Sequence, residues 1–175
     1  GQPLPERRLW CDAFVIRRFP VTNAEYLVYL NDLVDTGRAD EALSRAPRER
    51  SGTLAEDSPP IYGRGEDGHF CLVPDPDGDL WSPDWPVCLI DWYDASAYAA
   101  WTAARTGLPW RLPGELEWGK AGRGVDGRWF PWGWHFDPSR CCMNASVPGR
   151  RLPQPVTSFP TDVSVYGVRG MAGGM

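Results

Sequence analysis

The chain has 175 residues, of which 42% are hydrophobic, 13% aromatic and 23% charged, a balance typical of a soluble globular domain with a core. This composition excludes an intrinsically disordered chain, and since no run of about 18 apolar residues occurs, we expect no transmembrane helix. Its 18 basic and 23 acidic residues give a net charge of −5, so we expect neither a nucleic-acid partner nor attraction to an anionic membrane. The 10 tryptophans, 19 glycines and 18 prolines predict one irregular, loop-rich domain over residues 1–175.

The cysteines indicate a reducing environment. Five occur, an odd number, and a disulfide between the neighbours Cys141 and Cys142 would be strained. We therefore expect reduced cysteines and a cytoplasmic protein. Residues 1–6 contain neither an initiator methionine nor an apolar signal core, so we expect them to lie at the edge of a longer protein.

The first part of the chain predicts a strand followed by two helices. Apolar residues at the centre of 9–19 indicate the strand. Thr22 and Glu25 form a capping box, and apolar residues at helical spacing follow it, so a helix is expected to begin there and to end near Gly37. A second, short helix is predicted over 39–46.

The middle of the chain predicts loops and short strands. Residues 47–68 are polar and indicate a long surface loop, whereas 70–73 and 86–90 are apolar and indicate short strands. The aspartates of 75–79 are spaced like the start of a calcium loop, but Pro86 stands where such a loop needs a bidentate glutamate. We therefore favour a hairpin turn over a calcium site.

Two further helices are predicted after these strands. Asp91 or Asp94 is expected to cap a helix that ends before Gly107. A helix over 114–123 contains two glycines, which weaken it in isolation, so we expect packing around Trp118 to hold it. The rest of the chain shows no helical period and predicts coil with short strands.

Generic catalytic motifs are missing from the sequence. It contains no glycine-rich phosphate loop, no Gly-x-Ser-x-Gly and no His-Glu-x-x-His. His135 precedes Cys141 by six residues, with Cys142 beside it, and thiolates with an imidazole can bind a soft metal. Because no Cys-x-x-Cys pair supports such a site, we favour a buried pair of small apolar side chains.

Five segments in order resemble the formylglycine-generating enzyme (sulfatase-modifying factor) family. The sequence FPVTNAEY resembles the family's PVTNxEY, RLPGELEW resembles RLPTEAEWE, and the Pro-Trp-Gly and Tyr-Gly-Val-x-Gly-Met segments complete the order. The segments are residues 19–26, 86–101, 111–118, 121–133 and 155–173. The resemblance implies an α+β fold, an irregular, loop-rich variant of the C-type-lectin-like fold. It extends to the bacterial domains fused to serine/threonine kinases and to retroelement-diversified variable proteins.

The resemblance also identifies where the chain departs from the family. In the family the Gly-Met-x-Gly segment continues as GNVWEW, and a later half supplies a copper-binding cysteine pair that oxidises a substrate cysteine to formylglycine. This chain ends in Gly173-Gly174-Met175, so we expect the C-terminal part of the family fold to be missing. None of the five cysteines aligns with the pair, and no catalytic residue is carried over. Asn144 stands at the position of a family calcium ligand, with an ordinary turn asparagine as the alternative.

We therefore expect a non-catalytic module that recognises a protein or small-molecule ligand. Trp129, Trp132 and Trp134 are loop aromatics able to line a groove, although each also suits a structural role. The alternative is a copper-dependent oxidase whose catalytic half lies beyond this chain, and copper is expected only then. An iron-dependent oxygenase branch of the family receives no support from two histidines. A fold without its last strands exposes a sheet edge or an apolar patch, so we also expect a homodimer or a partner chain.

Overall fold

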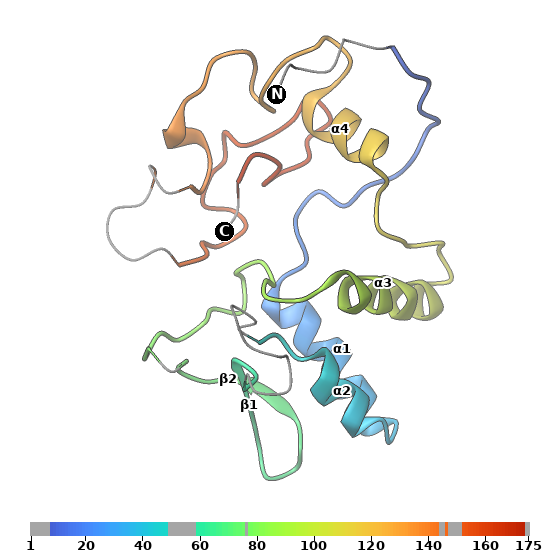
Figure 1. Cartoon of the computed structure of the whole chain (residues 1–175), viewed down its shortest axis with the longest axis vertical. Coiled ribbons are helices and arrows are strands. Elements are labelled where there is room, and N and C mark those ends of the chain that lie inside the picture. The colour runs from blue at the N-terminus through green and yellow to red at the C-terminus, as the bar shows by residue number, and fades with distance from the viewer. Residues whose placement is uncertain (1–7, 49–58, 76, 144–145, 147–151, 174–175) are drawn as a thin grey trace, which may run out of the picture.

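The structure is a computed structural model that describes residues 8–48, 59–75, 77–143, 146 and 152–173. Its elements are α1 (Asn23–Asp35), α2 (Ala39–Arg45), β1 (Tyr62–Arg64), β2 (Phe70–Leu72), α3 (Trp92–Thr106), α4 (Glu115–Arg123) and the 3₁₀ turn η1 (Pro138–Arg140). Figure 1 shows α1, α2, α3 and the β1–β2 hairpin gathered at one end, with α4 and the long irregular segment that follows it at the other. Helices with a small sheet make the described chain α+β, as the sequence predicts.

The predicted capping box begins α1. The Glu25 amide donates to the Thr22 hydroxyl at 3.3 Å, and the Thr22 amide donates to the Glu25 carboxylate at 2.9 Å. These contacts satisfy two of the amide groups that have no partner within a helix. Arg17 forms an ion pair with Glu25, and the hydrogen bonds from Thr22 and Arg17 lower the pKa of the Glu25 carboxyl against the opposing effect of burial.

An aromatic cluster forms the centre of the core between α1 and α3. Tyr26 and Tyr29 from α1 pack against Tyr98 from α3, with ring centroids 5.4–5.7 Å apart, and Trp101 lies 5.3 Å from Tyr29. Tyr26 and Tyr29 are buried. Edge-to-face and tilted ring pairs at these distances contribute beyond the area they bury. The helical spacing predicted for this segment therefore places its apolar face inward.

The β1–β2 hairpin packs against α1. The strands are antiparallel, with Tyr62 opposite Leu72, so the prediction of a loop throughout 47–68 is wrong for β1. The side-chain amide of Asn31 on α1 exchanges two hydrogen bonds with the Phe70 backbone, at 2.7 and 3.1 Å. These bonds pair backbone groups at the sheet edge, which explains why so short a hairpin forms here.

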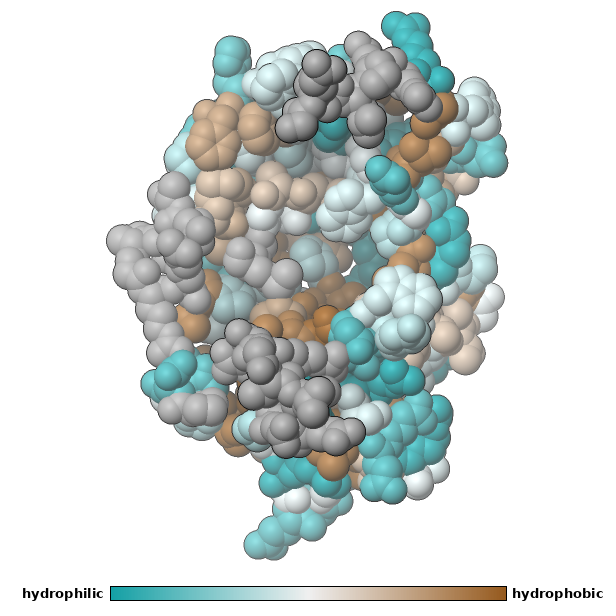
Figure 2. Space-filling model, in the orientation of Figure 1, coloured by the Kyte–Doolittle hydropathy of each residue, from teal (hydrophilic) through white to brown (hydrophobic). Residues whose placement is uncertain are grey.

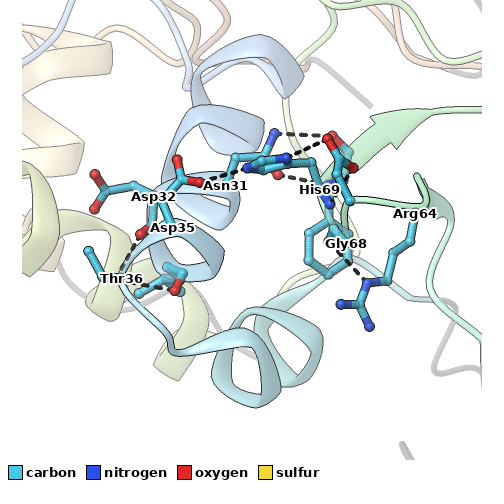
Figure 3. Close-up of polar contacts among 10 residues, drawn as sticks. Asn31, Asp32, Asp35, Thr36, Arg64, Gly68 and His69 are labelled. Carbon is cyan, nitrogen blue, oxygen red and sulfur yellow. Dashed lines mark hydrogen bonds and ion pairs between the residues drawn. The ribbon is translucent and has the colours of Figure 1, made fainter.

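His69 makes a second link between the hairpin and α1 (Figure 3). Its Nδ1 lies 2.7 Å from an Asp67 carboxylate oxygen and its Nε2 lies 2.8 Å from an Asp35 oxygen. These hydrogen bonds, the one to Asp67 first, raise the pKa of His69.

Asp75 organises the acidic turn that the sequence predicts. Its carboxylate accepts from the amides of Asp77 and Asp79, at 3.0 and 2.9 Å, and from the indole N–H of Trp81 at 3.1 Å. The Asp75 amide donates to the Asp79 carbonyl at 2.9 Å. The favoured turn is therefore confirmed, with the aspartate holding backbone donors of its own loop.

Two of the predicted strands do not form. Residues 9–19 are irregular, and Val15 is 87% exposed. A backbone hydrogen bond links this segment to the end of the chain: the Arg169 amide donates to the Arg18 carbonyl at 2.7 Å. Residues 86–90 are also irregular, because one bridge between Thr22 and Pro86 is not extended along the chain and Leu89 adopts a positive φ of 59°. Both segments are apolar, but neither runs alongside a strand long enough to form a ladder.

The last two helices begin as expected but pack differently. Asp91 caps α3: the Asp94 amide donates to the Asp91 carboxylate at 2.8 Å, and the Asp91 amide donates to the Asp94 carboxylate at 3.1 Å, so both predicted residues act together. Trp118 on α4 is 51% exposed, so the prediction that packing around it holds α4 is wrong. The buried face is formed by Ala121 and Gly122. A Cβ at Gly122 would lie 3.2 Å from the Met171 side chain, so the glycine permits this close packing.

The chain after α4 is irregular, as its composition predicts. It contains η1 and isolated bridges, such as the one between Val163 and Arg169. On the face shown in Figure 2, hydrophobic residues gather around a hollow near the middle and hydrophilic residues dominate one end. None of the described helices is long and apolar enough to cross a membrane.

Candidate functional site

The turn after α4 fixes the Arg128 side chain. Gly124 and Gly127, with φ of 71° and 80°, turn the chain immediately after the helix. Arg128 then forms a two-pronged ion pair with Asp126, at 2.9 Å from Nε and 2.6 Å from Nη2. The guanidinium lowers the pKa of the Asp126 carboxyl to about 2. Arg128 Nη1 also donates to the Pro131 carbonyl at 3.1 Å, so the side chain is held at three points.

A tight turn presents Trp132. Phe130 and Gly133 exchange two backbone hydrogen bonds, at 2.9 and 3.0 Å, and Gly133 has a φ of 141°, which L side chains rarely adopt. The Trp132 ring stacks on the Phe130 ring with centroids 5.3 Å apart and planes 7° apart. Its indole N–H donates to the His135 carbonyl at 2.9 Å. The Trp132 ring is therefore fixed on both its face and its edge.

The 3₁₀ turn η1 presents Arg140. Asp137 caps this turn by accepting from the Ser139 amide at 3.0 Å. Arg140 donates from Nε to the same aspartate at 3.2 Å. The Arg140 side chain is 41% exposed. Its charge is therefore balanced by a neighbour while much of the guanidinium remains accessible.

The 159–170 segment folds into consecutive turns stabilised by two buried side chains. The Asp162 amide donates to the Phe159 carbonyl at 3.1 Å, and its carboxylate accepts from the Ala172 amide at 3.4 Å. Burial raises the pKa of the Asp162 carboxyl. The Ser164 hydroxyl oxygen accepts from the amides of Tyr166 and Val168, each at 3.3 Å. These bonds give an otherwise irregular segment a defined shape.

Together these segments border a shallow, open cleft of about 330 Å³. It is lined by Arg128, Pro131, Trp132, Arg140 and the 160–165 segment. This volume lies at the lower end of the range for small-molecule sites, about 300–1,000 Å³. An aromatic face, proline and valine side chains, two guanidinium groups and two hydroxyl groups line it. This lining suits a ligand with both an apolar and a polar part.

Of the three predicted loop tryptophans, the cleft contains one. Trp132 lines it. Trp134 stands beside it, with the Arg128 guanidinium 5.6 Å from its ring centroid. Trp129 is 71% exposed and does not line the cleft. Asn144, the predicted calcium ligand, lies outside the described residues.

Sequence reasoning missed the arginines and the 160–165 segment of this cleft. Arg128 follows Asp126 by two residues and Arg140 follows Asp137 by three, so both look like local ion pairs. The 160–165 segment lines the cleft only because the fold places it beside residues 128–140, which are distant in sequence. A usable signal was the grouping of arginines with loop tryptophans between 128 and 140.

The cysteines lie apart from the cleft lining. All five are free, as expected, and Cys88, Cys141 and Cys142 are buried. Burial raises the pKa of the Cys88 thiol to about 12 and also raises the pKa values of Cys141 and Cys142. The favoured interpretation of Cys141 and Cys142 as buried small side chains is confirmed. Within the described ranges, no three histidine, cysteine, aspartate or glutamate side chains converge as a metal site.

Comparison with known proteins assigns the family. The sequence model of the family described as the sulfatase-modifying factor enzyme 1-like domain matches residues 2–175. The chain belongs to this family. The hercynine oxygenase of Mycolicibacterium smegmatis is 35% identical to this family domain over 171 residues, covering 92% of the chain and 35% of the relative. The formylglycine-generating enzyme of Bos taurus is 30% identical over 199 residues, covering 96% of the chain and 49% of the relative.

Relatives of this sulfatase-modifying factor domain also include proteins described as inactive. The inactive C-alpha-formylglycine-generating enzyme 2 of Bos taurus is 33% identical over 99 residues, covering 51% of the chain and 31% of the relative. The chain thus spans about a third of the hercynine oxygenase and about half of the formylglycine-generating enzyme. The count of two histidines therefore describes only the part of the relatives that this chain spans. It does not exclude membership of an oxygenase branch.

Proposed function

We propose that this domain is a non-catalytic recognition module and that the cleft between η1 and the 160–165 segment binds its ligand. The observation that carries the proposal is the cleft itself, in which the ring of Trp132 and two arginines face one concave space. Stacking on Phe130 and the hydrogen bond to the His135 carbonyl hold the Trp132 ring before any ligand binds. A preformed aromatic surface reduces the entropy cost of binding.

The division of the molecule into a packed part and a loop-built part supports this function. The α1–α3 core and hairpin pack on a shared aromatic cluster, whereas the cleft is built from turns and irregular chain. Loops held on a rigid scaffold commonly carry recognition sites. We extend the proposal to the fold and assign this scaffold to the C-type-lectin-like type that the family resemblance implies.

The state of the thiols also supports recognition over thiol chemistry in this part of the chain. A cysteine acts as a nucleophile or a metal ligand as its thiolate. Burial favours the neutral thiols of Cys88, Cys141 and Cys142 by raising their pKa values. We therefore assign these three cysteines a packing role.

The relatives favour a second candidate function. Proteins named formylglycine-generating enzyme and hercynine oxygenase match nearly the whole of this chain. On that alternative the chain is the first part of an oxidase domain, and the remaining part supplies the copper-binding cysteine pair. The cleft would then contribute substrate binding rather than a separate recognition function.

The recognition proposal is tested by mapping where small probes bind. Indole, benzamide, benzoate and benzylamine are titrated into the ¹⁵N-labelled chain, and amide and indole resonances are followed by NMR. We expect shifts concentrated at Trp132 and in the 160–165 segment, and we expect Trp132→Ala to abolish them. Trp10→Ala is the matched control, since Trp10 is 86% exposed and does not line the cleft.

Two results contradict the recognition function at this site. One is the failure of every probe to shift the cleft resonances. The other is binding that Trp132→Ala leaves unchanged. Thermal unfolding of each variant establishes that a loss of binding reflects the missing ring and not a loss of fold.

We further propose a cytoplasmic protein that acts on a protein or small-molecule ligand and that forms a homodimer or pairs with another chain. The free cysteines accord with the first part of this proposal. The exposed aromatic pair Trp92 and Tyr93, 66% and 69% accessible, accords with the second. Sedimentation velocity tests the association, with a monomer at micromolar concentration and no binding partner as the contradicting result.

A further inference from the structure

The two arginines of the cleft differ in how many of their donors are occupied. A guanidinium has five N–H donors. Arg128 donates from Nε, Nη1 and Nη2 to Asp126 and the Pro131 carbonyl. Among the residues that the structure describes, Arg140 donates from Nε alone, to Asp137 at 3.2 Å. The two terminal nitrogens of Arg140 therefore remain available at the cleft.

Asp137 does not occupy this available edge. One of its carboxylate oxygens accepts from the amide and the hydroxyl of Ser139, at 3.0 and 2.6 Å, and the other accepts from Arg140 Nε. The Ser139 donors, more than Arg140, lower the pKa of Asp137. Asp137 thus stays ionised through Ser139 and balances Arg140 from the Nε side. The pair of terminal nitrogens can bind two oxygens of one anion in the bidentate manner.

Ser164 supplies a second donor to the same cleft. The residue is 5% exposed and lines the cleft, and its oxygen already accepts from the Tyr166 and Val168 amides. Those two bonds use the lone pairs of the hydroxyl and leave its hydrogen to be donated. No residue in the described part of the chain accepts that hydrogen. A buried hydroxyl with an unused donor favours a ligand that carries an acceptor.

We propose that the cleft binds the oxyanion of a small aromatic ligand, a carboxylate or a phosphate, through Arg140 and Ser164, while Trp132 contacts the ring. This inference rests on the proposed recognition function and specifies the chemistry of its ligand. The oxyanion accepts from the terminal nitrogens of Arg140 and from the Ser164 hydroxyl. The ligand ring packs on the indole that Phe130 holds in place.

The test measures the dissociation constants of three probes by isothermal titration calorimetry. Benzoate and phenyl phosphate carry the two oxyanions, and benzamide is the neutral analogue. We expect at least one anion to bind the intact chain about tenfold more tightly than benzamide, and Arg140→Gln to remove that preference. Arg140→Lys keeps the positive charge but lacks the two terminal nitrogens of the guanidinium, so we expect it to retain part of the preference for the anion.

Arg38→Gln provides the matched control. Like Arg140, Arg38 forms an ion pair with an acid three residues away, in its case Glu41 at 2.7 Å, but it does not line the cleft. We expect this variant to keep the full preference for the anion. Preference for benzoate or for phenyl phosphate then identifies the oxyanion that the site selects. Unfolding temperatures are compared so that a misfolded Arg140 variant is recognised, and Ser164→Ala, which removes the second donor, provides an independent test.

The inference and the recognition function fail in different ways. Equal affinity for benzamide and both anions, with unchanged binding by Arg140→Gln and Ser164→Ala, overturns the oxyanion site but leaves a cleft that binds aromatic molecules. If Arg38→Gln removes the anion preference and Arg140→Gln keeps it, the anion binds elsewhere. That result also overturns the proposed oxyanion site. If none of the three probes shifts the Trp132 resonances in NMR titrations, the recognition function itself is contradicted.

Discussion

The indole N–H of Trp101 donates a 2.8 Å hydrogen bond to the carboxylate of Asp32 and so joins α3 to α1. Arg105 binds the other oxygen of that carboxylate at 3.0 Å, and its guanidinium lies 4.8 Å from the Trp101 ring centroid. The contact lies at the edge of the aromatic cluster formed by Tyr29 and Tyr98. A polar bond thus fixes the orientation of a ring that apolar packing alone would leave free to shift.

Removing this bond is expected to weaken the packing of α3 on α1. Asp32→Ala should lower the free energy of unfolding by about 1–2 kcal/mol, because a hydrogen bond to a charged partner is lost at a site that is partly exposed. Trp101→Phe tests the same bond from the other side. A double-mutant cycle by urea denaturation should give a positive coupling energy, and strictly additive effects would contradict the account.

A buried bond between Tyr62 and Asn23 predicts a larger effect. The Tyr62 hydroxyl donates to the Asn23 side-chain oxygen at 2.6 Å, and both residues are buried. Tyr62→Phe leaves that oxygen without its donor, so we expect a loss of about 1–3 kcal/mol. Tyr93→Phe is the control, because Tyr93 is 69% exposed and should change stability little. Equal urea midpoints for the two variants would show that the buried bond adds nothing.

The His69 bridge predicts a pH dependence of stability. Its pKa is raised in the folded chain, chiefly by Asp67 and then by Asp35, above the unfolded value of about 6.5. The stabilisation is therefore fully present below about pH 6.5 and is lost as the pH rises through the raised folded pKa. The free energy of unfolding of the intact chain minus that of His69→Gln should fall over this interval in urea titrations.

Asp67→Asn separates the two carboxylates of the bridge. With Asp35 retained, the pH-dependent difference should become smaller without vanishing, since one of the two hydrogen bonds to His69 remains. A difference between the intact chain and His69→Gln that stays constant or grows with pH would mean that the bridge does not favour protonated His69.

Thiol labelling tests the packing role assigned to the cysteines. Cys71 is exposed and should react first with an aromatic disulfide reagent at pH 8. Cys88, whose pKa burial raises to about 12, should react only as the chain unfolds. Cys71→Ser should remove the fast phase and leave the slow ones. Rapid labelling of Cys88 in the folded chain would be inconsistent with its burial.

Local signals in the sequence predicted the helices better than the strands. Thr22 and Glu25 specify the start of α1 through contacts three residues apart, so the sequence contains all the information needed. Strand formation over 9–19 and 86–90 needed a partner in register, which no local pattern supplies. The packing of α4 likewise depends on Met171, which lies against Gly122 and is distant from the helix in sequence.

The candidate site was predictable only in part for the same reason. The loop tryptophans, Trp132 among them, are visible as candidates because aromatic side chains in loops can line a groove. The fold brings Trp132 and the distant 160–165 segment to the same cleft. No local sequence pattern predicts that contact. Arg140 was hidden by its neighbour Asp137, since an arginine beside an aspartate normally indicates no more than a surface ion pair.

The central claim, recognition without oxidation by this chain, is tested most directly by mass spectrometry of a substrate peptide. The purified chain is incubated with Cu(I), oxygen and a peptide carrying a sulfatase-type cysteine, beside a formylglycine-generating enzyme as the positive control. We predict that the peptide keeps its cysteine thiol with this chain while the control converts it to the aldehyde. Formation of formylglycine by this chain would contradict the account.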